Sequence, residues 1–296
     1  MIKQRSNWWG YALGMISGIT YGMNPLFGVP VLKKGLDVIS LLFYRYGIAV
    51  LLMLAFMLAT RKSLKISMKQ FLMMLLIGTL FTACSVTLFF AYDYIPSGIA
   101  TSVLYVYPIM VAVLMMLLGQ HPSGRTWISI FTGVAGAVLL SFNGEGGFID
   151  WRGIVLVVLS GLSYSFFIII VNQSKLLKSM PNLTLTFYCF LVGSMELFLF
   201  MRCGLDLNPV PDAVSWWNVI GLAVLPTTVA TITLAAASKS IGPTKTSVMG
   251  ILEPLTAIVV GTMVFHEPFT VHIGIGIALI LFSILFMVLS KAKKLV

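Results

Sequence analysis

The chain has 296 residues, of which 59% are hydrophobic and only 9% charged, and its formal net charge is +10. Soluble domains carry about 25% charged residues, so nine acids and nineteen bases cannot give a globule of this size a hydrated surface. This composition excludes a soluble enzyme and a nucleic-acid-binding protein. It also excludes a disordered chain, which requires low hydrophobicity and high charge. The solvent that suits this composition is the lipid bilayer.

Continuous apolar runs predict membrane-spanning helices, each of which needs about 20 residues to cross the hydrocarbon core. Runs such as 41–58 do not alternate between polar and apolar residues, as the strands of an outer-membrane barrel do. We therefore expect an all-α membrane protein with ten transmembrane helices and short connections. In chain order, the expected helices are residues 8–31, 38–59, 69–92, 96–118, 126–142, 153–173, 183–204, 215–238, 244–265 and 270–290.

The positions of Lys and Arg predict the orientation of these helices, because loops rich in positive charge remain in the cytoplasm. With both termini inside, fourteen of the nineteen bases lie in cytoplasmic segments and only four lie outside. We therefore expect both termini to be cytoplasmic. The excess of positive charge then faces the anionic inner leaflet.

The two halves of the chain repeat one pattern. Residues Ser17–Tyr21 match Ser160–Tyr164 at an offset of 143, and Pro108 matches Pro254 at an offset of 146. The matches keep the same order, and their offset drifts by only three residues.

Each half, 1–146 and 147–296, holds five expected helices. Because five is odd, the second half must be inverted relative to the first. Inverted repeats are an architecture of secondary transporters, in which the substrate site lies near the midplane and access alternates between the two sides.

Several motifs resemble those of one family over nearly the whole chain. They are Gly18–Gly22 in the first helix, Phe43–Arg45 in the second, Ala91–Ile95 at the end of the third, and Gly242–Pro268 in and after the ninth. These residues resemble the EamA family of the drug/metabolite transporter superfamily, which contains ten-helix carriers of the bacterial inner membrane. Gly119–His121 departs from the pattern, because the family usually has a Gly-Glu pair there.

The resemblance implies a multi-pass, secondary-active transporter of small metabolites in the bacterial inner membrane. Family members typically export amino acids and other metabolites, and some import them. Export of amino acids or related compounds is the expected function. An uptake permease or a facilitative, channel-like carrier for another metabolite or a drug is the alternative. A membrane-embedded enzyme is the second alternative.

Charged side chains within the expected spans are the first candidates for function, because each costs about 2.5–3.5 kcal/mol on insertion scales. Glu253 lies well inside the ninth helix and precedes Pro254, which cannot donate to the backbone and frees a carbonyl one turn earlier. A carboxylate beside an opened backbone can bind an amine, a cation or a proton, so Glu253 is the candidate for proton coupling. The alternative is a structural carboxyl group bonded to a neighbouring helix. The symmetry-related residue is Tyr107.

Arg45 lies about seven residues into the expected second helix. Its guanidinium could extend to the outer headgroups, pair with Glu196 or Asp93, or bind a substrate carboxylate through its two-pronged geometry. We expect a structural role for Glu196, in the outer half of the seventh helix.

Neutral polar residues mark the expected lining of the pathway. Asn24 and Pro25 interrupt the first helix, and broken backbone is tolerated only against protein or a water-filled cavity. Ser and Thr in membrane helices also bond their own backbone or join helices, and Tyr105 could stack on a planar substrate or simply fill space. The complete set of expected substrate-pathway residues is Tyr21, Asn24, Arg45, Tyr105, Ser163, Tyr164, Thr228, Thr231 and Glu253.

The sequence lacks the motifs of enzymes, metal sites and ATP-driven transporters. The three His residues lie at expected loop edges, the three Cys residues have no paired spacing, and no Gly-x-x-x-x-Gly-Lys loop is present for ATP. We therefore expect no catalytic residues, metal or cofactor.

Small residues recur every four positions at Gly14, Gly18 and Gly22, and again in the fifth and tenth helices. This spacing lets helices approach closely, either within a monomer or at a homodimer interface. The expected partners are therefore a small-molecule substrate, the bilayer and at most a second copy, with no nucleic acid.

Overall fold

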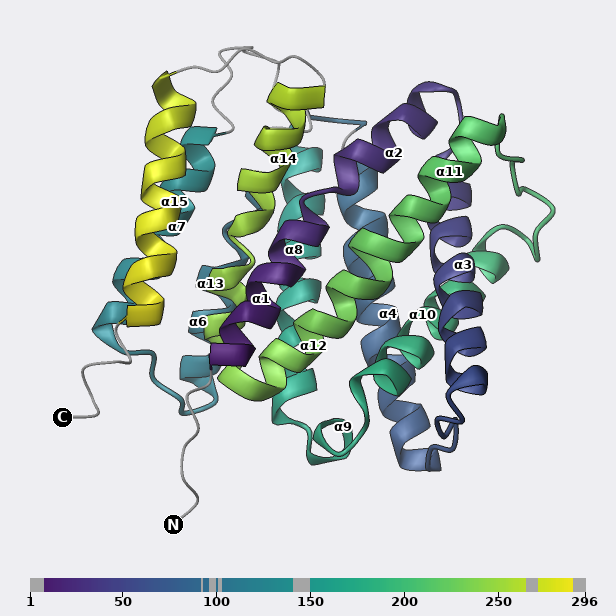
Figure 1. Ribbon diagram of the computed structural model, residues 1–296, viewed down its shortest axis with the longest axis horizontal. Coiled ribbons are helices and arrows are strands. Elements are labelled where there is room, and N and C mark those ends of the chain that lie inside the picture. Colours follow the sequence, from purple (N-terminus) through teal and green to yellow (C-terminus); the bar gives the residue numbers. More distant parts are fainter. Residues whose placement is uncertain are drawn as a thin grey trace.

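A computed structural model describes residues 8–91, 93–95, 100, 103–140, 150–264 and 271–289. Every regular element in this part of the chain is a helix, and the helices stand side by side in one bundle (Figure 1). The elements are α1 (Trp8–Tyr21), α2 (Asn24–Lys33), α3 (Val38–Ala59), α4 (Met68–Ala91), α6 (Tyr107–Leu117), α7 (Gly124–Leu140), α8 (Trp151–Gln173), α9 (Lys175–Lys178), α10 (Asn182–Phe200), α11 (Ala213–Leu222), η1 (Ala223–Val229), α12 (Ala230–Ile241), α13 (Pro243–Met249), α14 (Leu252–Val264) and α15 (Val271–Leu289).

Five helices of the described ranges are long and apolar enough to cross a membrane. Four of them are α3, α4, α8 and α10, and the fifth is the continuous helix 213–241 formed by α11, η1 and α12. The remaining apolar helices are shorter. The all-helical expectation is therefore confirmed for the described residues, and the chain is a multi-pass membrane protein.

Four of the expected spans are interrupted near the middle of the bundle, and a proline accounts for each interruption. The first span breaks at Gly22 and Met23, just before Pro25, and the ninth breaks at Gly250 and Ile251, just before Pro254. A turn precedes α6, whose second residue is Pro108, and a π-helical segment holds Pro226. Proline removes a backbone donor and clashes with the preceding turn, so an unbroken α-helix cannot continue through these positions.

The glycines of α1 allow it to pack closely on the broken ninth span. A Cβ atom at Gly18 would lie 2.8 Å from the Met249 backbone oxygen, and one at Gly14 would lie 2.9 Å from the Met249 Cβ. Helices α7 and α15 approach in the same way, since a Cβ atom at Gly136 would lie 2.8 Å from the Gly276 oxygen. These glycines of α1 and α7 therefore pack against other helices of this chain.

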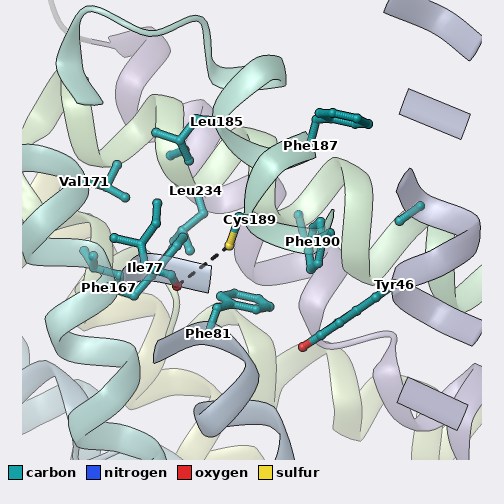
Figure 2. Packing of buried hydrophobic residues seen from close by; sticks show 14 of the residues in the cluster. Tyr46, Ile77, Phe81, Phe167, Val171, Leu185, Phe187, Cys189, Phe190 and Leu234 are labelled. Carbon is teal, nitrogen blue, oxygen red and sulfur yellow. Dashed lines mark hydrogen bonds between the residues drawn. The ribbon is translucent and has the colours of Figure 1, made fainter. Parts of the chain in front are cut away.

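An aromatic cluster joins α3, α4, α8 and α10 beside the interrupted helices (Figure 2). The rings of Phe81 and Phe167 are 5.1 Å apart, and those of Phe81 and Phe190 are 5.3 Å apart, both edge to face. This geometry is favourable for aromatic pairs. Cys189 lies beside these rings and donates to the Ile77 carbonyl at 3.9 Å. The cluster therefore packs tightly beside the interrupted helices.

Candidate functional site

Glu253 lies in the first turn of α14, directly after the break in the ninth span. Its backbone N–H donates to the Gly250 oxygen at 2.9 Å, which compensates for the donor that Pro254 lacks at that carbonyl. The half-buried Glu253 carboxylate has no hydrogen bond or ion pair with the described residues, although the charge of Arg45 is within electrostatic range. The Glu253 carboxylate therefore keeps hydrogen-bond acceptor capacity that the described residues do not use.

Arg45 projects from α3 and is only 3% exposed. Its Nε donates to the Thr227 Oγ1 at 2.5 Å, and its Nη2 donates to the Pro226 backbone oxygen at 3.2 Å. This burial argues against a guanidinium that extends to the headgroups. Pairing with Glu196 is not observed either, because that carboxylate accepts a hydrogen bond from Thr79 at 2.5 Å. Arg45 is thus a buried cation held by two neutral acceptors.

Hydroxyl and aromatic contacts connect the other broken helices around these charges. The hydroxyl groups of Tyr21 and Thr231 are 2.7 Å apart, which joins α1 to α12. The Tyr164 ring meets both Tyr21 and Tyr107 edge to face, at 6.4 Å and 5.0 Å between centroids. Tyr107 in turn donates to the Ser247 oxygen at 3.0 Å. The structure thus brings together Tyr21, Tyr164 and Thr231 from the expected set.

The remaining expected residues are less closely tied to this group. The Asn24 Oδ1 is buried at the start of α2 and has no hydrogen-bond partner in the described structure. Thr228 donates to the Ala223 oxygen at 2.8 Å, so it follows the structural alternative of bonding its own helix. Tyr105 is buried in the turn before α6. Ser163 is half-buried on α8, next to Tyr164.

The partners of Arg45 were not expected from the sequence. The available signal was Pro226, a proline inside an apolar run, because it predicts a local departure from α-helical hydrogen bonding. A second unexpected contact joins α4 to α8, where Ser160 donates to the Cys84 oxygen at 2.7 Å. Both contacts depend on tertiary packing.

Two hollows lie at opposite ends of the bundle. One, of about 320 Å³, lies between the segment Gln120–Ser123 and the start of α13 at Gly242–Lys245. The other, of about 410 Å³, lies between Leu36–Ile39 and the end of α4.

The described residues contain no group of three or more His, Cys, Asp or Glu side chains that could hold a metal ion. The polar groups near the helix breaks are one carboxylate, one guanidinium, and several hydroxyl and amide groups. Such a set can bind and orient a polar solute through hydrogen bonds and charge.

Comparison with known proteins identifies the family. A model of the EamA-like transporter family matches residues 8–142 and 151–289. An uncharacterized transporter of Archaeoglobus fulgidus is 30% identical over 193 residues, which are 64% of this chain and 66% of that protein. The uncharacterized inner membrane transporter YedA of Escherichia coli is 22% identical over 283 residues, which are 95% of this chain and 90% of YedA.

Two further likenesses agree with this assignment. The uncharacterized transporter YvbV of Bacillus subtilis is 23% identical over 209 residues, 68% of this chain and 67% of YvbV. A crystal structure of another protein shares the fold, with a TM-score of 0.81 at 18% identity, over 97% of this chain and 99% of that one. The family and its named relatives are transporters rather than enzymes. This chain belongs to the EamA-like transporter family.

Proposed function

We propose that this membrane transporter is a secondary-active carrier of small metabolites that bear both a carboxylate and an amine. Amino acids and related compounds are the first candidates. The carrier exports them across the bacterial inner membrane by alternating access. The alternative function is uptake of a metabolite or drug by the same route, and no contact in the structure favours it over export.

The observation that carries this proposal is a pair of opposite charges near the helix breaks. Arg45 is buried without an acid within salt-bridge distance in the described structure, and the Glu253 carboxylate has no hydrogen-bond partner there. A charge buried without an opposite charge beside it is costly. A zwitterion would satisfy both groups, because its carboxylate can bind the guanidinium and its ammonium can bind the Glu253 carboxylate.

The proposed architecture has ten spans in two inverted five-helix repeats, 1–146 and 147–296, with both termini in the cytoplasm. The start of α1 and the end of α15 lie at the same end of the bundle (Figure 1), as an even number of spans requires. The family model also matches the chain in two segments. Breaks before Pro108 and Pro254 occupy corresponding places in the two halves, and discontinuous helices of this kind form substrate sites in transporters.

Glu253 is the proposed site of proton coupling. Its carboxyl group can take a proton when the substrate ammonium leaves, so the two ligands would compete for the same oxygens. The proposed pathway consists of this residue with Tyr21, Arg45, Tyr164 and Thr231. Asn24, Tyr105, Ser163 and Thr228 complete the proposed lining.

The test is proton-driven transport of labelled L-amino acids in proteoliposomes, with Glu253→Gln and the matched variant Glu196→Gln. Both substitutions neutralise a carboxyl group in an expected span, but Glu196 is bonded to Thr79. We expect Glu253→Gln to lose transport or its dependence on pH, while Glu196→Gln retains both. Wild-type flux and pH dependence in Glu253→Gln would refute the coupling proposal.

A further inference from the structure

The π-helical segment η1 interrupts the helix 213–241 near its middle. Pro226 lies inside it and supplies no backbone N–H. The hydroxyl groups of Thr227 and Thr228 donate to the oxygens of Leu222 and Ala223, five residues earlier, at 2.7 Å and 2.8 Å. Segments of this kind are rare and frequently mark functional sites. Because each π-helical hydrogen bond spans one residue more than an α-helical one, conversion of the segment to an α-helix would shift its two flanks by one residue relative to each other.

Arg45 of α3 contacts this segment through two hydrogen bonds. The guanidinium bridges the Thr227 hydroxyl and the Pro226 oxygen, which are adjacent along η1. Arginine has five N–H donors, and these two bonds use two of them. Both acceptors are neutral, whereas a carboxylate carries the opposite charge and frequently binds a guanidinium through two parallel hydrogen bonds.

Contacts on each side of η1 join halves of the first and eighth spans in pairs, an outer pair of α2 with α11 and an inner pair of α1 with α12. On one side, α11 is tied to α2 by the ion pair of Lys34 with Asp212 at 2.6 Å. On the other side, α12 is tied to α1, since Ser17 donates to the Ala230 oxygen at 2.9 Å. The break between α1 and α2 and the segment η1 therefore separate the same two pairs of helices.

We infer that Arg45 is a clamp on η1 that a substrate carboxylate opens. Without a carboxylate, Arg45 fixes the π-helical turn. A bound carboxylate takes over the guanidinium donors, frees Pro226 and Thr227, and lets α2 and α11 move as a pair relative to α1 and α12. Because the carboxylate binds more strongly to the released arginine, it favours the released state, as a ligand-driven change requires. This inference rests on the proposed carriage of carboxylate-bearing metabolites.

The test is amide hydrogen exchange of residues 222–231, followed by mass spectrometry of the full chain in lipid nanodiscs. The probes are a mixture of the twenty proteinogenic L-amino acids and the matching mixture of their carboxamides, which keep the amine and the side chain. In the wild type, we expect the amino acids to accelerate exchange at least about threefold and the carboxamides to leave it unchanged.

Thr227→Val removes one acceptor of the clamp and retains Arg45. We expect about tenfold faster exchange without ligand, since a hydrogen bond to a charged group is lost, and little further response to the amino acids. Thr233→Val is the matched control, because the Thr233 hydroxyl bonds only backbone oxygens, those of Val229 and Ala230, and does not contact Arg45. It should keep slow exchange and the response to carboxylates.

An equal response to amino acids and carboxamides would overturn the clamp, as would slow exchange in Thr227→Val. Counterflow of labelled amino acids in the same preparation separates the two proposals. Counterflow without any change in exchange at 222–231 overturns the clamp and leaves the carrier in place. If neither counterflow nor a change in exchange is observed, the proposed substrate class is overturned together with the clamp.

Discussion

Substitution of Gly22 by Ala should destabilise the fold, because this glycine lets the break in the first span lie directly against the ninth. A Cβ atom there would meet the Glu253 backbone oxygen and would lie 2.5 Å from the Thr256 Cβ. An ordinary contact begins near 3.4 Å, so the helices must separate by about 1 Å. Overpacking of this kind costs about 1–3 kcal/mol.

Gly28→Ala is the matched control on the same span, because a Cβ atom at Gly28 meets nothing within 4 Å. Gly28 lies inside α2, where replacing glycine by alanine gains about 0.5–1 kcal/mol. The two variants should therefore differ in free energy of unfolding by about 1.5–4 kcal/mol. The measurement is unfolding of each purified variant in mixed micelles titrated with SDS. Equal stability of the two variants would refute the close packing of these broken helices.

Two further predictions concern contacts between spans. A double-mutant cycle with Tyr21→Phe and Thr231→Val should give a coupling energy of about 0.6–1.5 kcal/mol for the 2.7 Å hydroxyl contact; zero coupling in SDS unfolding would contradict it. The Lys34 ammonium and the Ser215 amide lower the pKa of Asp212 from 3.8 to about 2. The stabilisation is therefore present above about pH 4 and lost as pH falls through about 2. Between pH 5 and pH 2, the free energy of unfolding should therefore fall more in the wild type than in Asp212→Asn, which lacks the carboxylate. Equal pH profiles of the two proteins would argue against the ion pair.

Much of the fold follows from the sequence, because hydrophobic runs report directly on burial in lipid. The interruption near Asn24 and Pro25 was expected and is observed. The sequence predicts a helix over 215–238, and the structure shows that this helix contains a π-helical segment at Ala223–Val229. A proline predicts that an α-helix is disturbed there, but the surrounding contacts decide which irregular form results.

The candidate site could be predicted only in part. Scarcity of charge within the spans pointed to Glu253 and Arg45, because a charged group in a bilayer is costly. Their surroundings could not be derived in this way. The bonds of Arg45 to Pro226 and Thr227 join residues more than 180 positions apart, and helix packing determines such distances.

We propose that this chain is a carrier whose substrate binds at Arg45 and Glu253. Counterflow in proteoliposomes tests it most directly. Vesicles loaded with an excess of unlabelled amino acids should transiently accumulate the labelled compound from outside, because a carrier exchanges one substrate for another. Uptake that is independent of the internal amino acids, or equal in empty vesicles without protein, would contradict the account.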